Sequence, residues 1–149
     1  MLEQICREIN NHFIQTPLCG NYSIRNSVIS PLSLLEGQRF WIVGSALNDG
    51  VYTFHENGIR NDDDTEAVGL SDEDFGGTIC AMAVPTAVIA LSAEINKWVA
   101  KYGENAVSPY TSENVIGVYS YTKATGSNGT GGISWKDAFK DRLKGWRKL

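Results

Sequence analysis

The stretch VPTAVIALSAEINKWVAKYG, residues 84 to 103, constrains the fold more than any other part of the chain. Its apolar side chains recur every three or four residues, which places them along one face of an α-helix: Val84, Val88, Leu91, Ile95, Trp98 and Tyr102. Pro85 suits the first turn of such a helix, and Gly103 suits its C-terminal cap. The pattern predicts a core helix, and the rest of the fold must cover its apolar face.

Two further helices are predicted near the ends of the chain. Residues 2 to 14 have helical spacing and are followed by two residues that end helices, Pro17 and Gly20. Near the other end, the glycine-rich run GSNGTGG reads as a flexible linker, and Ser134 with Asp137 forms a capping signal. An apolar stripe then predicts a short basic amphipathic helix over 134–147, formed by Trp135, Phe139, Leu143 and Trp146.

Between these helices, the stretch FWIVGSALNDGVYTF, residues 40 to 54, has the pattern of a β-hairpin. It alternates, reaches Asn48-Asp49-Gly50, and then continues with residues of high strand propensity. An Asp-Gly pair is a strong turn signal, because the turn needs positive φ and glycine adopts it easily. Two more strand-like stretches, 21–30 and 77–82, complete a small sheet of three or four strands, with Tyr22, Ile24 and Val28 as inward positions.

The sequence therefore predicts an α+β fold. Its body would be helical, made of the N-terminal, central and C-terminal helices, with a small antiparallel β subdomain inserted over about 21–82. A length of 149 residues suits a single domain spanning 1–149.

Charge is distributed unevenly along the chain. Between Asn61 and Asp74 there are acids and no base: Asp62, Asp63, Asp64, Glu66, Asp72, Glu73 and Asp74. From Lys136 to Lys148 there are six basic residues and only two acidic ones. A negative segment and a positive end on one chain favour head-to-tail association of like subunits.

No motif for catalysis, cofactor binding or metal binding is found. His12 and His55 have no partner at a telling spacing, and Cys6, Cys19 and Cys80 show no CxxC pattern. The run NDDDTE lacks the glycine and the closing glutamate of an EF-hand, so a solvated acidic loop is favoured over a divalent-ion site. The N-terminus has no signal-peptide core, and no apolar run has the length of a membrane span. We expect a non-enzymatic protein that needs no cofactor and has reduced thiols.

The predicted C-terminal helix has three alternative roles. A short helix of this kind is marginal in water by itself. Its apolar stripe would therefore fold onto the chain's own core or onto a partner. Its tryptophans and bases would also allow contact with nucleic acid.

Several phrases of the chain resemble the small head–tail connector proteins, also called adaptors or head-completion proteins, of tailed phages and prophages of Gram-positive bacteria. The phrases are GSALNDGVY, VPTAVIALSAEI, YSYTKATG and the tryptophan-bearing helix SWKDAFKDRLKGWRKL. The resemblance implies a virion protein that assembles in the bacterial cytoplasm as a ring, expected to be twelvefold, at the head–tail interface. Its partners would be the portal ring and a tail-completion or tail-terminator protein. Genomic DNA would pass through the ring without sequence-specific binding.

Within this resemblance, two groups of residues are candidates for partner contacts. The first is the tethered helix, as a docking arm, with Trp135, Phe139, Leu143 and Trp146. The second is the hairpin, as an interaction module on a helical body, with Asn48, Asp49, Gly50 and Tyr52. Such adaptors are mostly helical, so a β insertion of this size is a departure from the family.

Two alternative functions remain. One is a tail-side completion or terminator protein. The other is a small nucleic-acid-binding regulatory protein that uses the basic helix together with Tyr119 and Tyr121, although the net charge of −4 opposes it.

Overall fold

A computed structural model describes residues 1–103, 105–106, 112–115, 119–122 and 133–148, with side chains in 1–103 and 134–148. Its main elements in chain order are α1 (Leu2–Glu8), β1 (Ile14–Arg25), β2 (Val28–Ser30), β3 (Arg39–Val43), β4 (Gly50–His55), β5 (Gly58–Asn61), β6 (Glu73–Met82) and α2 (Thr86–Tyr102). Short strands follow, β7 (Asn105–Ala106), β8 (Ser112–Val115), β9 (Tyr119–Thr122) and β10 (Ile133–Ser134), and then the helices α3 (Trp135–Ala138) and α4 (Lys140–Lys144).

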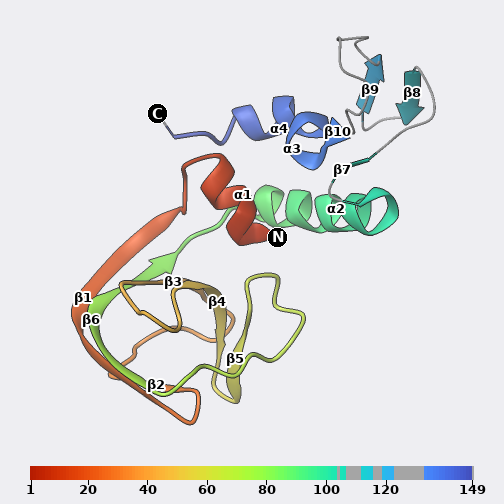
Figure 1. The fold of residues 1–149 in the computed structure, drawn as a ribbon. Helices are drawn as coiled ribbons and strands as arrows, with labels where there is room; N and C mark the ends of the chain where they lie inside the picture. The colour runs from red at the N-terminus through yellow and green to blue at the C-terminus, as the bar shows by residue number, and fades with distance from the viewer. Residues whose placement is uncertain (104, 107–111, 116–118, 123–132, 149) are drawn as a thin grey trace.

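The body of the protein is a β-sheet, not a bundle of helices. Six antiparallel strands in the order β2-β1-β6-β3-β4-β5 curl into a nearly closed barrel, and the helices lie together at one end of it (Figure 1). The predicted α+β fold, with a helical body and a small β insert, is therefore wrong. The predicted strand over 21–30 covers only the last part of β1, which begins at Ile14, so the prediction assigns too few residues to the sheet.

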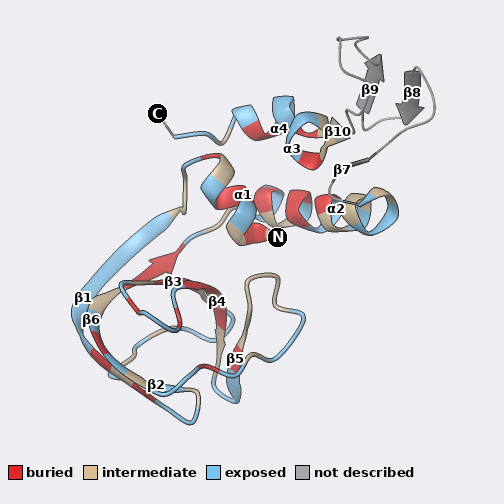
Figure 2. Cartoon of the chain, in the orientation of Figure 1, coloured by how far each residue is buried: buried red, intermediate tan, exposed pale blue. Residues whose placement is uncertain are grey.

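One hydrophobic core fills the inside of the barrel. Alternate residues of each strand point inward, as the period of two along a strand requires. The inward set includes Tyr22, Ile24, Phe40, Ile42, Phe75 and Ile79. The predicted inward positions Tyr22 and Ile24 are confirmed, whereas Val28 is exposed. Figure 2 shows buried residues on the inner strands and along the facing sides of the helices.

A second core lies between the outer face of the barrel and the helices. It joins Val51 of β4 and Met82 of β6 to residues of α1 and α2. The predicted central helix is confirmed as Thr86–Tyr102, with Val88, Leu91 and Ile95 buried. Gly103 caps it at φ 79, a conformation that glycine adopts without strain.

The N-terminal helix is shorter than predicted. It ends at Glu8, and Asn10 and Phe13 then take positive φ values of 52 and 50. These values lie outside the helical region, so the chain leaves the helix before the predicted end at residue 14. Strand β1 follows and runs through Pro17 and Gly20, because its pairing with β6 overrides their helix-ending role.

The turns also differ from the prediction. β3 and β4 are joined by a loop over 44–49, in which Gly44 has φ 92, and Gly50 is already a strand residue. Tight two-residue hairpins lie instead between β4 and β5 and between β1 and β2, and in the latter Asn26 and Ser27 have φ 51 and 63. Two consecutive positive φ values are typical of a type I′ hairpin turn. The predicted linker GSNGTGG and the second half of the phrase YSYTKATG, residues 123–126, lie outside the described residues.

Candidate interaction surface

The loop between β3 and β4 is held by the side chain of Glu73, the first residue of β6. Its carboxylate accepts hydrogen bonds from Ser45 Oγ at 2.5 Å, Ala46 N at 2.8 Å and Asn48 Nδ2 at 3.0 Å. These bonds hold the pKa of Glu73 below its ordinary value, and the bond from Ser45 has the largest effect. The Asn48 amide also donates to the Ser71 carbonyl at 3.0 Å and accepts from the Ser71 N–H at 2.8 Å. The loop is therefore tied to β6 at several points.

Most of the predicted hairpin contact residues are structural. Asn48 is 3% exposed, Gly50 is buried, and the half-buried Tyr52 packs against the inner core. Of the four candidates, Asp49 alone is exposed. The large exposed apolar residue of this loop is Leu47, which the sequence reasoning did not select.

The predicted docking arm is folded onto the chain's own core, one of the alternatives that the sequence left open. Trp135, Phe139 and Leu143 are buried among residues of the second core. Trp146 packs partly on that core, and its ring meets Phe13 edge-on at a centroid distance of 6.2 Å. The arm is two short helices, not one, and its apolar stripe is covered within the chain.

The bases of this C-terminal segment also have partners within the chain. Lys136 and Arg147 both pair with Glu8, at 2.9 and 3.2 Å. Arg142 pairs with Glu94 of α2 at 2.5 Å, through both of its terminal nitrogens. Three of the six bases are therefore matched by acids of α1 and α2, which leaves fewer cations for phosphate groups.

The acidic segment is likewise bound to the body. Asp63 accepts hydrogen bonds from Ser92 Oγ at 2.8 Å and Asn96 Nδ2 at 2.9 Å, both on α2. Asp74 pairs with Arg25 across β6 and β1 at 2.6 Å. Asp63 therefore fastens the barrel to α2, and Asp74 fastens β6 to β1.

Both histidines make contacts within the fold. His55 contacts the Glu36 carboxylate through Nδ1 at 2.5 Å and the Asp64 carboxylate through Nε2 at 2.7 Å. Both contacts raise the pKa of His55, and the contact with Asp64 has the larger effect. Both ring nitrogens are therefore occupied within the chain. His12 stacks on Trp41 at 3.9 Å, and burial lowers its pKa. No group of histidine, cysteine and acidic residues in the described part of the chain is placed to hold a metal ion.

The three thiols are free. Burial raises the pKa of Cys6 to about 12 and also raises that of Cys80, so neither is a ready nucleophile. Cys19 is exposed on β1. In the described residues, no helix combines the length and the apolar character that crossing a membrane would require.

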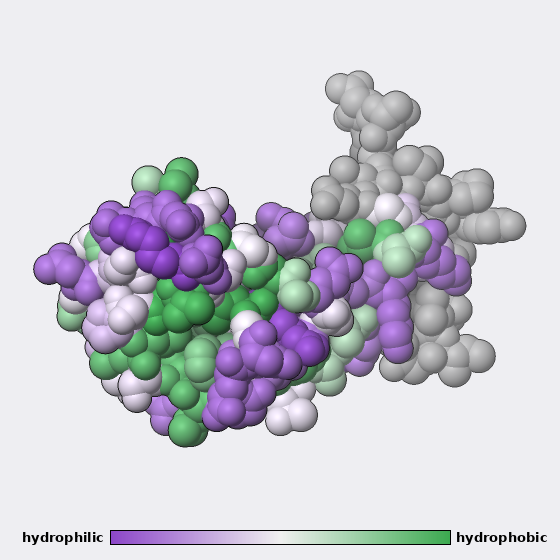
Figure 3. Space-filling view, turned by 90° about the horizontal axis from the view of Figure 1, so that it is seen from below, coloured by the Kyte–Doolittle hydropathy of each residue, from purple (hydrophilic) through white to green (hydrophobic). Residues whose placement is uncertain are grey.

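Large apolar side chains are exposed on the barrel. Val28 is 66% exposed and Leu35 is 75% exposed, and they lie at the two ends of the segment that follows the β1–β2 turn. Within this segment, Leu32 and Leu34 pack partly on the inner core. Seen from below, hydrophobic residues gather on the barrel between hydrophilic ones (Figure 3). We call residues 28–35 the apolar segment.

Strand β1 has a free edge. Over 14–21 every residue is exposed, including Ile14 at 48% and Leu18 at 37%. One side of β1 pairs with β6, but the other side pairs with β2 only from Ser23 to Arg25. No described residue pairs with the outer side of β1 before Ser23. We call residues 14–22 of β1 the free edge.

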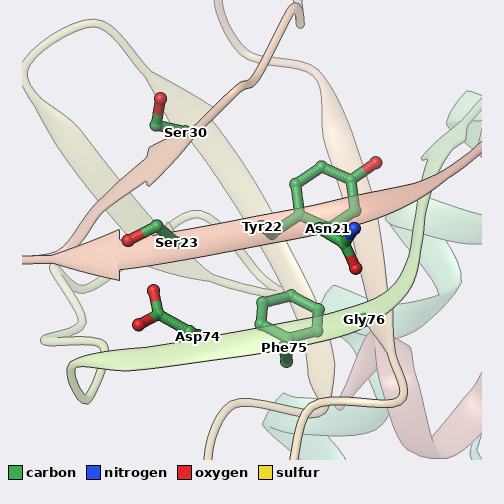
Figure 4. Close-up of a pocket in the computed structure, with 7 residues that line it drawn as sticks. All are labelled: Asn21, Tyr22, Ser23, Ser30, Asp74, Phe75 and Gly76. Carbon is green, nitrogen blue, oxygen red and sulfur yellow. The ribbon is translucent and has the colours of Figure 1, made fainter.

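A hollow of about 460 Å³ lies where β2 leaves β1. Its lining comes from three strands: Asn21, Tyr22, Ser23, Ser30, Asp74, Phe75 and Gly76. The rings of Tyr22 and Phe75 lie on one side of the paired strands, and Ser30 lies apart from them on β2 (Figure 4). The hollow therefore has two aromatic rings and a polar rim.

The sequence reasoning missed the free edge because it assigned residues 2–14 to a helix that Pro17 and Gly20 would end. One signal for it was present. The chain has no Asp, Glu, Lys or Arg between Ile9 and Ile24, which is unusual in a solvent-exposed segment of an acidic protein.

Comparisons with models of protein families, with curated proteins and with solved structures give no match to this chain. The protein is a small antiparallel barrel with attached helices, and its large exposed apolar residues lie on the barrel.

Proposed function

We propose that this chain is a non-enzymatic structural subunit of a tailed-phage particle, joining the portal to the tail. Copies of it would form a ring that continues the DNA channel, with a tail-completion or tail-terminator protein on the far side. The observation that carries the proposal is the position of the exposed apolar residues. All five large ones among the described residues lie on the barrel and none on the helices: Ile14, Leu18, Val28, Leu35 and Leu47.

Five large exposed apolar side chains on the barrel of a small acidic protein favour a protein–protein contact on the barrel. The resemblance of the phrases GSALNDGVY and VPTAVIALSAEI to connector proteins supports the portal as the partner. The C-terminal helices and their bases Lys136 and Arg142 are engaged within the chain and are not the contact surface. The proposal assigns the contacts to the barrel.

Two alternatives remain less well supported. A tail-side completion or terminator protein would use the same apolar surface, and it would differ in binding tail components instead of the portal. Nucleic-acid binding is disfavoured because Lys136, Arg142 and Arg147 are paired with carboxylates. Passing DNA would meet an acidic protein without a specific contact.

Co-sedimentation with purified portal rings from the same genome tests the proposal. We expect the full chain to sediment with the rings. Val28→Lys and Leu35→Lys should weaken binding about tenfold, because each places a charge in the apolar segment. Gln4→Lys is the control, since Gln4 is an exposed residue of α1 on the helical end. A full chain that stays in the supernatant at all ring concentrations would refute the portal as partner.

A further inference from the structure

We infer that His55 is a proton-controlled latch for the apolar segment. Its charged ring ties this segment, through Glu36, to the loop that follows β5, and loss of one proton from the ring releases the tie. The latch acts within the free protein, so it goes beyond the proposed function and does not depend on the identity of a partner.

Three parts of the chain meet at the ring of His55, the last residue of β4. Glu36, the residue directly after the apolar segment, places a carboxylate oxygen 2.5 Å from Nδ1. Asp64, in the loop after β5, places one 2.7 Å from Nε2. The His55 side chain is only 17% exposed, because it lies between these two loops. The ring therefore joins the two loops to each other.

The two contacts together require the charged form of the ring. An ionised carboxylate only accepts hydrogen bonds, whereas a neutral imidazole has one N–H and one nitrogen that is itself an acceptor. The imidazolium ring donates from both nitrogens and attracts both acids. After loss of one proton, a nitrogen lone pair of His55 would face a carboxylate, and that contact would open. The raised pKa of His55, due chiefly to Asp64, agrees with this arrangement.

The contact with Glu36 is the one expected to open. Asp64 has a second cation close by, since Arg60 Nε lies 4.0 Å from the oxygen that contacts the ring. The Glu36 side chain is 56% exposed and that of Asp64 is 35% exposed, so water replaces the ring more easily at Glu36. The neutral ring therefore keeps its proton on Nε2, toward Asp64. A further charged residue, Glu56, follows His55 in the chain, and its side chain is exposed.

Release of Glu36 loosens the end of the apolar segment. The second oxygen of the Glu36 carboxylate accepts from the Glu56 N–H at 2.8 Å, so this side chain also holds the turn between β4 and β5. Directly after it, the Gly37 N–H donates to the Phe54 carbonyl at 2.8 Å, a bond that does not involve the ring. Opening is therefore confined to residues before Gly37. These include Leu35, which at 75% is the most exposed large apolar residue of the described chain.

Backbone NMR relaxation of the full chain tests the latch, with measurements below pH 6.5 and above the titration midpoint of the His55 ring. When the ring is charged, we expect the order parameters of Leu35 and Glu36 to have the rigid value of about 0.85. When the ring is neutral, they should fall below about 0.6. Ile79, a buried residue of β6, should stay rigid under both conditions.

Glu36→Gln is the test variant, because it should reverse the pH dependence. The new amide can donate to the neutral Nδ1 while its oxygen still accepts from the Glu56 N–H, so the segment should be rigid at high pH. At low pH the charged ring and the amide would both be donors, so the segment should become mobile. Glu56→Gln is the matched control, since it makes the same substitution in an exposed neighbour and keeps the backbone N–H, and it should follow the wild type.

Three results would overturn the latch. The first is a wild-type segment with the same order parameters on both sides of the His55 midpoint. The second is a Glu36→Gln variant with the pH dependence of the wild type, because release would then not pass through this contact. The third is a loss of order in Ile79 together with Leu35, which would mean that the whole barrel loosens. Portal binding enters none of these measurements, so the latch and the connector function can fail separately.

Discussion

The phenolic hydroxyl of Tyr22 donates a hydrogen bond of 2.6 Å to the carbonyl oxygen of Leu18, four residues earlier in the same strand. The ring reaches back over Gly20, where a Cβ would lie 3.7 Å from the ring. The same relationship occurs once more, where Tyr52 donates to the Asn48 carbonyl at 3.1 Å. The spacing Gly-x-Tyr thus marks two places where a ring covers its own strand.

Tyr22→Phe is expected to lower the free energy of unfolding by about 1 kcal/mol, because it removes one partly buried hydrogen bond and keeps the ring. Urea unfolding followed by circular dichroism measures the change. Tyr52→Phe should lose a similar amount or less, since its bond is longer. Unchanged stability in Tyr22→Phe would mean that the hydroxyl is equally well satisfied by water.

Gly77→Ala should be among the most damaging small substitutions in the barrel. A Cβ at Gly77 would lie 2.4 Å from the Val43 carbonyl oxygen, a backbone atom of the neighbouring strand. We expect a loss of about 2–3 kcal/mol in unfolding free energy. The control is Gly76→Ala, whose Cβ would lie 3.2 Å from Asn21 Oδ1, an atom of a side chain that can move. Equal losses at the two positions would contradict the close approach of β3 and β6.

Glu73 should contribute stability that depends on acid pH. Its folded pKa lies below the ordinary 4.5, chiefly because Ser45 donates to it. The contribution is therefore complete above pH 4.5 and is lost as the pH falls through the lower folded pKa. In urea unfolding, the stability gap between wild type and Glu73→Gln should narrow on acidification. A gap that stays constant down to strongly acid pH would show that Glu73 has an ordinary pKa.

His55 should act in the opposite direction, near neutral pH. Asp64 and Glu36 raise its folded pKa above the ordinary 6.5. Its contribution is complete below pH 6.5 and is lost as the pH rises through the higher folded pKa. Proton NMR titration of the ring measures that pKa, and His55→Gln should remove this pH dependence of unfolding. A titration midpoint below 6.5 would contradict the two carboxylate contacts.

Phe139→Ala tests whether the C-terminal helices belong to the core. Phe139 is 4% exposed, and its ring meets that of Trp98 edge-on at 6.3 Å. Truncation of a buried phenylalanine typically costs about 3–5 kcal/mol, so a large fall in thermal stability is expected. The neighbouring exposed Lys140→Ala is the control and should change little. A stable Phe139→Ala variant would return this helix to the role of a docking arm.

Local patterns were sufficient for part of the fold. The stripe through Val88, Leu91 and Ile95 determined the central helix, and the alternation of Phe40 and Ile42 determined a strand with one buried face. Ser134 also caps the first C-terminal turn as expected, accepting from the Asp137 N–H at 3.2 Å. These signals depend on residues close in sequence, so no knowledge of distant partners was needed.

The arrangement of the strands and the exposed surface of the barrel could not be predicted from local sequence patterns. Pro17 and Gly20 normally end regular structure, yet both lie within β1 because ten register pairs with β6 hold the strand. Asn48 and Gly50 predict a tight turn. The structure has a longer loop, because the Glu73 carboxylate binds the Asn48 amide from a strand far along the chain. Charges that looked free in the sequence, such as Lys136 and Glu8, are paired in the fold.

The sequence by itself determined which segments are amphipathic, where the core helix lies, and that one long stretch near the N-terminus lacks charge. Only the tertiary structure decided that strands build the body, that the C-terminal stripe is covered by the chain's own core, and that β1 keeps a free edge. The physical reason is that burial and strand pairing join residues far apart in sequence, such as Leu18 and Ile79. Their contact energies outweigh the local preferences of single residues.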